Sequence, residues 1–279
     1  MKSAITHAAW IGLALSTVVT PTFAQFRENT EKQLTCENGG YDNDRVRHCE
    51  MREMNAPAIG RLNIDGLRNG GASIKGWSRG DVLVRARVEA SGETDSAATG
   101  MVSQVSIDTS GGQVLARGPE PHDNAWWSVS YEIFVPHNTD LSLKTHNGGI
   151  NISDVRGQIH FEGNNGGVNM KRVAGDLTGS TVNGGIQVEL TGTMSDFRQL
   201  ELSTHNGGVT VAMPSTFSAR FQAETNNGGI HSDFPLPPQP QIQPNVRPRK
   251  LDATIGAGGP LIHVTTSNGQ VSLKKTELQ

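Results

Sequence analysis

Apolar and polar residues alternate through much of this chain, and between residues 141 and 232 the alternation recurs with a nearly fixed period. Each repeat contains Asn-Gly-Gly followed by an aliphatic residue. The five copies begin at Asn147, Asn165, Asn183, Asn206 and Asn227, which are 18, 18, 23 and 21 residues apart. A degenerate copy begins at Asn268. Repeats of this size predict stacked coils, each of which buries its apolar face against its neighbours.

The apolar positions within each copy fall on every second residue, which is typical of a strand with one buried face. Six residues before the asparagine stand Leu141, Ile159, Leu177, Leu200, Phe221 and Ile262. Before the asparagine the apolar residues occupy even offsets, and after it they occupy odd offsets, so the corner has to absorb a shift of one residue. Asn and Gly tolerate positive φ, and we therefore expect that conformation at the corners, including Gly184.

Two folds are compatible with such repeats. In an antiparallel meander each Asn-Gly pair would form a hairpin. In a β-solenoid, equivalent residues form parallel ladders in which asparagine amides hydrogen-bond to one another. Because the same residue types recur in each column, we predict an all-β fold, a β-solenoid similar to a parallel β-helix, with coils of about 18–23 residues and each asparagine above the previous one. The predicted corner residues are Asn147, Gly148, Asn165, Gly166, Asn183, Gly184, Asn206, Gly207, Asn227 and Gly228.

Residues 58–136 show less regular strand patterns. Residues 91–100 are small and polar, and we expect a flexible loop there. In residues 126–135, Trp127 lies on the apolar face of the predicted strand and Trp126 on the opposite face. Trp126 is therefore either an exposed contact residue or a side chain packed under a loop.

The N-terminus has the pattern of a secretory signal. Residues 1–24 contain Lys2, an apolar stretch over residues 8–19 and a small residue, Ala24, at the expected cleavage site. The apolar stretch is too short for a transmembrane anchor, and no later segment is long and apolar enough to span a bilayer. We expect an exported chain that begins at Gln25 and is periplasmic, displayed on the cell surface or secreted.

Residues 25–57 contain the two cysteines of the chain, Cys36 and Cys49. In an exported protein such a pair suggests one disulfide. The alternative is a metal site that adds His48 and nearby aspartates, but two cysteines without a second pair fall short of a closed zinc site. We expect the disulfide.

Three segments carry a resemblance to a known family. Ser73-Ile74-Lys75-Gly76-Trp77, then Ile133-Phe134-Val135-Pro136 leading into the repeats, and finally Thr265-Thr266-Ser267-Asn268-Gly269 resemble the DUF4097 family of β-strand-repeat proteins. The resemblance covers roughly residues 58–275. It implies a β-solenoid-like fold in exported bacterial proteins that are often labelled adhesins and are similar to the heads of autotransporter adhesins. It implies no catalytic residues.

These patterns divide the chain into a signal peptide (1–24), a disulfide-containing segment (25–57), an irregular β region (58–136) and the repeat solenoid (137–279). The proline-rich residues 234–250 interrupt the solenoid. Proline excludes a sheet and favours polyproline structure, so this segment is either a docking peptide or an excursion loop between coils, and we expect the loop.

Composition and side-chain chemistry mostly exclude functions. A net charge of −3 over 279 residues gives no basic surface for nucleic acid. His146 and His205 occupy equivalent corner positions but would lie about three rungs, or ~14 Å, apart, too far to share a metal ion. The acids Asp154, Glu162, Asp176, Glu189, Glu201 and Glu224 fall at different repeat positions. We therefore predict no catalytic, cofactor-binding or metal residue and no cofactor.

The sequence favours an exported, non-enzymatic structural or adhesin-like interaction protein of the bacterial cell envelope. Its expected partner is a protein or polysaccharide surface component, because repeat proteins present extended faces. The alternative is a polysaccharide-active β-helix enzyme, a lyase or hydrolase. Self-association through uncapped solenoid ends is a third hypothesis.

Overall fold

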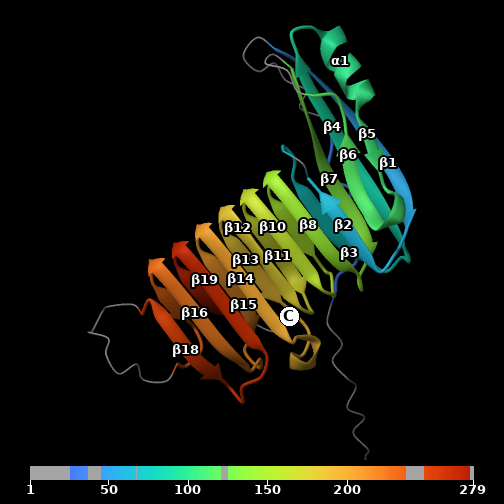
Figure 1. Ribbon diagram of the computed structural model, residues 1–279. Coiled ribbons are helices and arrows are strands. Elements are labelled where there is room, and N and C mark those ends of the chain that lie inside the picture. The colour runs from blue at the N-terminus through green and yellow to red at the C-terminus, as the bar shows by residue number, and fades with distance from the viewer. Residues whose placement is uncertain (1–25, 37–44, 67, 121–124, 237–247, 277–279) are drawn as a thin grey trace, which may run out of the picture.

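The computed structural model describes residues 26–36, 45–66, 68–120, 125–236 and 248–276. The predicted signal peptide and most of the proline-rich segment lie outside these residues. Two sheets of ten strands each face one another, and the core lies between them (Figure 1). We call them sheet I (β1-β4-β7-β3-β9-β11-β13-β15-β20-β17) and sheet II (β18-β16-β19-β14-β12-β10-β8-β2-β6-β5). The predicted all-β, solenoid-like fold is confirmed.

Each repeat contributes one strand to each sheet, and the Asn-Gly-Gly corner joins the two. In sheet II the repeat strands are β8 (Asp140–Asn147), β10 (Ile159–Asn165), β12 (Leu177–Asn183), β14 (Gln199–Asn206), β16 (Ala219–Asn227) and β19 (Leu261–Asn268). In sheet I they are β9 (Ile150–Ser153), β11 (Val168–Val173), β13 (Ile186–Leu190), β15 (Val209–Pro214), β17 (Ile230–Ser232) and β20 (Val271–Thr276).

Neighbouring repeats pair in parallel and in register. Leu141 pairs with Ile159, and Ile159 with Leu177, along one buried column. The predicted change of phase is present, because β8 buries residues at even offsets from Asn147 and β9 buries Ile150 and Ile152 at odd offsets. Each coil thus presents an apolar interior to the next, which is why isolated coils would have no core.

The order of the coils corrects the expectation that each asparagine lies above the previous one. The last coil, β19 and β20, lies between the coils that begin with β14 and β16 (Figure 1, red strand). The cause is β18 (Lys250–Ile255), which pairs antiparallel with the far edge of β16 and so carries the chain past the end of the stack. The chain then returns and fills a gap one strand wide.

The stack also begins earlier than residue 137. β2 (Arg61–Asp65) pairs in parallel with β8, and β3 (Ala72–Trp77) pairs in parallel with β9. Asn69 forms a parallel bridge with Asn147. Residues 61–77 are therefore an additional coil that precedes the regular repeats in the stack.

Segments before and after this first coil together form a projection that we call the blade. Three long strands, β1 (Val46–Pro57), β4 (Asp81–Gly92) and β7 (Trp126–Pro136), pair antiparallel and extend sheet I. The short strands β5 (Ser106–Asp108) and β6 (Gln113–Arg117) extend sheet II opposite them. The blade projects from the stack, with α1 (Asp95–Gln104) at its tip (Figure 1).

Helix α1 covers residues 95–100 of the segment predicted as a flexible loop (91–100), so that prediction was wrong. The Thr94 hydroxyl caps the helix by accepting a hydrogen bond from the Ala97 N–H, at 3.1 Å. Ala98, Met101 and Val102 are buried and follow the i, i+3, i+4 spacing of an apolar helical stripe. Among the described residues, no helix is long and apolar enough to cross a bilayer. Two 3-10 turns, η1 (Ser110–Gly112) and η2 (Met194–Asp196), complete the described elements.

Candidate interaction surface

The corner asparagines form one continuous ladder along the edge of the stack. The amide nitrogen of each donates to the amide oxygen of its neighbour, at 2.8 to 3.0 Å. In spatial order the ladder runs Asn69, Asn147, Asn165, Asn183, Asn206, Asn268, Asn227. Asn69 and Asn268 thus join the five asparagines singled out from the sequence. All amides point the same way, so each one except the first donates to its neighbour and each one except the last accepts.

The first glycine after the asparagine has the expected positive φ at Gly166 and Gly207, 155° and 158°, but not at Gly148, Gly184 or Gly228, so a second reason for glycine operates at the corners. Gly184 has no positive φ, and among the described residues other than glycine only Asp154 and Arg172 have one. A Cβ on Gly184 would instead collide with the carbonyl oxygen of Gly166 in the neighbouring coil. The corners of adjacent coils pack backbone against backbone, and this contact leaves no room for a side chain.

Buried threonines close the corner from inside. The hydroxyl of Thr204 donates to the carbonyl oxygen of Gly184 at 2.8 Å, and that of Thr266 donates to Gly207 at 2.8 Å. Equivalent bonds come from Thr145, Thr181 and Thr225. These bonds give each buried hydroxyl an acceptor. Thr145 bonds within its own corner, and the other four attach their strand to the corner of the neighbouring coil.

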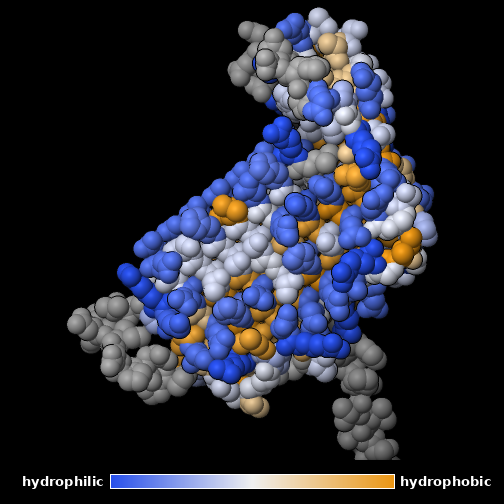
Figure 2. All heavy atoms as spheres, viewed as in Figure 1, coloured by the Kyte–Doolittle hydropathy of each residue, from blue (hydrophilic) through white to orange (hydrophobic). Residues whose placement is uncertain are grey.

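The outer face of sheet II is polar and regular across six neighbouring repeat strands. Five residues before the asparagine it carries Ser142, His160, Thr178, Glu201, His263 and Gln222. Three residues before the asparagine it carries Lys144, Glu162, Ser180, Ser203, Thr265 and Glu224. Hydrophilic residues dominate the view over these strands, with hydrophobic residues at scattered positions (Figure 2). We call this surface the sheet II face.

The histidines and acids on the sheet II face make local contacts and do not converge. The His146 ring lies 3.0 Å from the Asn164 amide, and His205 is three strands away, as expected. Glu162 lies 3.5 Å from His160 and 3.7 Å from Lys144. Among the described residues no group of three or more His, Cys, Asp or Glu side chains is placed to hold a metal ion.

The other acids singled out from the sequence lie apart from these. Asp176 accepts a hydrogen bond from the Arg198 N–H at 2.9 Å. Glu224 pairs with Lys250 on the edge strand at 3.3 Å. Glu189 lies on sheet I, and Asp154 is completely buried there. The six acids therefore form no shared site.

The outer face of sheet I carries a buried charge cluster where the blade joins the stack. The Glu132 carboxylate is 3 % exposed and pairs with Lys75 Nζ at 2.8 Å and with Arg85. Residues 26–36, which we call the N-terminal strap, cover it, and the N–H groups of Gln33 and Leu34 donate to the same carboxylate at 2.9 and 3.2 Å. Burial raises the pKa of Glu132, but these four donors outweigh it and hold the pKa below its ordinary value.

The strap makes a second set of buried polar contacts at Asp154. This carboxylate accepts hydrogen bonds from the Arg27 N–H at 2.9 Å and from the Asn29 side-chain amide at 2.5 Å. Arg172 forms a two-point ion pair with it, at 2.6 Å for both bonds. Burial acts to raise the pKa of Asp154, and the hydrogen bonds lower it by more, so the side chain stays ionised.

Sequence reasoning missed the charge cluster at Glu132. Its signal was a charged residue inside a mostly apolar strand segment, Arg85 in residues 82–88 and Glu132 in residues 129–135. Because both alternate with apolar neighbours, the strand pattern places them on the outward face, where solvation is the usual outcome. The strap that buries them has no repeat pattern, and no sequence pattern predicts where it docks.

Cys36 is the last residue of the strap, and Cys49 and Trp126 lie on the blade strands β1 and β7. Cys36 and Cys49 form the expected disulfide, with their Cα atoms 5.8 Å apart, and it fixes the end of the strap to β1. Trp126 is half-buried under the guanidinium of Arg47, which lies 5.6 Å from its ring centroid. Its role as a contact residue stays a prediction.

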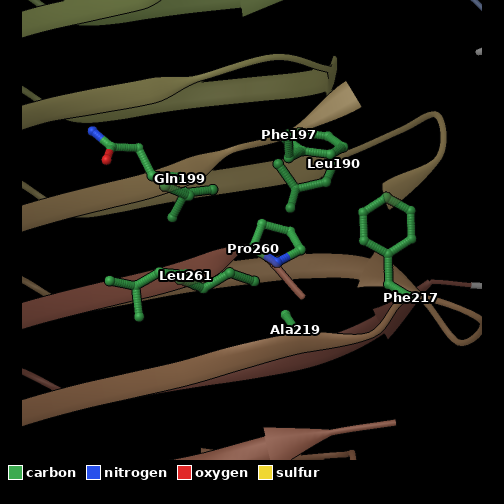
Figure 3. Close-up of a pocket in the computed structure, with 9 residues that line it drawn as sticks. Leu190, Phe197, Gln199, Phe217, Ala219, Pro260 and Leu261 are labelled. Atoms are coloured by element: carbon green, nitrogen blue, oxygen red, sulfur yellow. The ribbon is translucent and has the colours of Figure 1, made fainter. Parts of the chain in front are cut away.

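A small hollow lies at the side of the stack opposite the asparagine ladder (Figure 3). Its walls are mainly apolar, including Phe197, Phe217 and Pro260, and Gln199 is the polar member. Its volume of ≈ 10 Å³ is about the space that one water molecule needs. The hollow is a packing defect around the inserted last coil and offers no room for a substrate.

The geometry defines a two-sheet β-solenoid with a projecting blade, a class of protein built from stacked coils. A family model described as Toastrack DUF4097 matches residues 78–274, and the chain belongs to this family. No curated protein matches the chain.

Several solved structures are similar over 82 % of this chain. A "putative cell adhesion protein" from Clostridium sporogenes is 10 % identical, is covered over 100 % of its own length and gives a TM-score of 0.41. A "putative adhesin" from Bacteroides fragilis is 9 % identical, with 97 % coverage and a TM-score of 0.34. A "putative lipid binding protein" from Parabacteroides distasonis is 12 % identical, with 96 % coverage and a TM-score of 0.36.

Proposed function

We propose that this chain is an exported, non-enzymatic structural or adhesin-like interaction protein of the bacterial cell envelope. The sheet II face supports this proposal, because six parallel strands hold polar side chains in register on one extended surface. Repeat proteins bind through surfaces of this kind, which engage a partner at many weak points. The partner is a protein or polysaccharide component of an envelope or matrix surface.

Two further observations are consistent with this function. The Cys36–Cys49 disulfide suits an oxidising compartment outside the cytoplasm, in line with the predicted signal peptide. The described acids make separate local contacts, and the hollow in Figure 3 is apolar and too small for a sugar. A glycoside hydrolase would need two carboxylates facing each other across a substrate cleft, at ~5–10 Å.

The test compares two triple variants of the chain that starts at Gln25. The face variant replaces His160, Glu162 and Glu201 with serine, and the control variant replaces Asn151, Lys171 and Gln187 on sheet I with serine. All six side chains are exposed, so both variants should fold. We expect the wild type and the control to bind envelope fractions or polysaccharide, and the face variant to bind at least about tenfold more weakly, or ~1.4 kcal/mol.

Equal binding by the two variants would remove the sheet II face from the proposal. A wild-type chain that binds neither envelope protein nor polysaccharide would contradict the function itself. Turnover of a polysaccharide that disappears in a Glu162→Gln or Glu201→Gln variant would establish the enzyme instead.

A further inference from the structure

The N-terminal strap crosses the outer face of sheet I without joining the sheet as a strand. Starting near Asp154, it passes over Gly76 of β3 and Glu132 of β7 and ends at Cys49 of β1. Seven of its eleven residues are exposed, and Phe26 and Leu34 are half-buried. The strap therefore adds little to the hydrophobic core, and polar contacts hold most of its length.

Four of these polar contacts involve the strap's main chain. The N–H groups of Arg27, Gln33 and Leu34 donate to buried carboxylates of sheet I. The carbonyl oxygen of Glu31 accepts from Lys75 Nζ at 2.9 Å. Hydrogen bonds to main-chain groups recognise a linear peptide, and this part of the site places few demands on the peptide's sequence.

Strap side chains contribute as well: Glu28 accepts a hydrogen bond from the Ser78 N–H at 2.9 Å and Lys32 pairs with Glu53 at 2.8 Å, both at exposed positions. Two less exposed side chains, Phe26 and Asn29, add selectivity at one end of the site. The Phe26 ring stacks on His137, with centroids 5.3 Å apart, and the Arg156 guanidinium lies 5.7 Å from the Phe26 centroid. Three residues further along, the Asn29 amide donates to Asp154 at 2.5 Å and to the Gly76 carbonyl oxygen at 3.3 Å. An aromatic residue followed three positions later by asparagine is thus the motif that fits.

The receiving side chains are arranged before any peptide docks. Glu132 lies between Lys75 and Arg85, and Asp154 is paired with Arg172, so sheet I itself holds both carboxylates in place and ionised. A preorganised acceptor of N–H groups binds more tightly than one that has to be ordered by its ligand.

From this geometry we propose that the outer face of sheet I is a binding site for a linear peptide of about ten residues, of the form aromatic-x-x-Asn. The chain fills the site in cis with its own strap. A partner protein with such a segment competes for it. The Cys36–Cys49 disulfide ties the strap to β1 and raises its local concentration, so it favours the strap over the competitor. This site is separate from the sheet II face, and either proposal can fail without the other.

The test uses a fluorescent synthetic peptide with the sequence of residues 26–35 and the full chain from Gln25. In the Cys36→Ser/Cys49→Ser variant the tether is loosened, and we expect saturable binding by fluorescence anisotropy. The oxidised wild type should bind the same peptide at least about tenfold more weakly. A peptide with Phe26→Ala and Asn29→Ala should lose most of its affinity for the variant, because it lacks the ring that stacks on His137 and the amide that donates to Asp154. These changes are in the peptide and leave the folded protein untouched.

A second variant keeps the test decisive if the cysteine-free chain fails to fold. In the oxidised full chain, Phe26→Ala together with Asn29→Ala weakens the strap in cis, and the unmodified peptide should now displace it. Absence of saturable binding to any folded variant, or equal binding of the two peptides, would overturn the proposal. A strap-exchanged dimer that binds no peptide would assign the site to a second copy of the chain and would also overturn it.

Discussion

The repeat stack and the blade are built from the same kind of strand but by different rules. In the stack each residue meets its own equivalent in the next coil, as asparagine meets asparagine and leucine meets isoleucine. In the blade the antiparallel strands pair unlike residues, such as Arg85 with Glu132, and the resulting partners are unique. Contacts that recur in every coil thus stabilise the stack, whereas the blade depends on individual residue pairs that do not recur along the chain.

The largest effect should come from breaking one of these unique pairs. Glu132→Ala leaves the buried Lys75 without its counter-ion, leaves Arg85 paired with Glu53 alone, and removes the acceptor of two strap N–H groups. We expect a loss of about 3–5 kcal/mol in the free energy of unfolding, measured by urea denaturation. The matched change Glu224→Ala breaks an exposed pair with Lys250 and should cost at most about 1 kcal/mol. Similar losses for the two would erase the distinction between the regions.

The next largest effect tests the close approach of the corners in the stack. Gly184→Ala places a methyl group against the Gly166 carbonyl oxygen and should destabilise the fold by about 2–4 kcal/mol. At Gly167 a Cβ would lie 3.5 Å from the nearest atom, an ordinary contact. Gly167→Ala should therefore change the stability by less than about 1 kcal/mol. If thermal melting ranks the two in the opposite order, backbone contact is not what selects glycine here.

A smaller loss is expected from interrupting the asparagine ladder. Asn183→Ala removes one hydrogen bond to Asn165 and one from Asn206, and should cost about 1–2 kcal/mol. Asn226→Ala, one residue before the ladder position of its own coil, changes an exposed residue outside the ladder and serves as control. Chemical denaturation of both variants at neutral pH measures the difference. A ladder variant as stable as the control would mean that solvent replaces the amide bonds at no cost.

The smallest effect should be a shift of a few degrees in the melting temperature on mild acidification. The pKa values of Glu132 and Asp154 lie below their ordinary values in the folded chain, because both accept several hydrogen bonds. Their contribution to stability is therefore complete above about pH 5 and is lost as the pH falls through about 4 and below. Glu132→Gln, which cannot titrate, should flatten this dependence in melting curves between about pH 6 and about pH 3. An unchanged slope would show that Glu132 does not sense pH.

The same contrast explains how much of the molecule the sequence predicts. The columns through Leu141 and Asn147 could be aligned because every coil repeats them, and the ladder and the buried faces follow from that alignment. The positions of Asn268 and α1 could not, because they depend on where β18 and the blade strands place the chain. The strap is the extreme case, since its contacts at Glu132 and Asp154 join residues about one hundred positions apart without any shared pattern.

The position of the last coil has a consequence for how the protein is made. Strands β16 and β17 do not pair with the strands of the earlier coils, because β19 and β20 lie between them. As the chain is synthesised from its N-terminus, the coils up to Pro214 can pair in sequence order, but β16 and β17 cannot yet join them. The last coil therefore completes the stack, because residues 261–276 have to be present before β16 and β17 can pair with it.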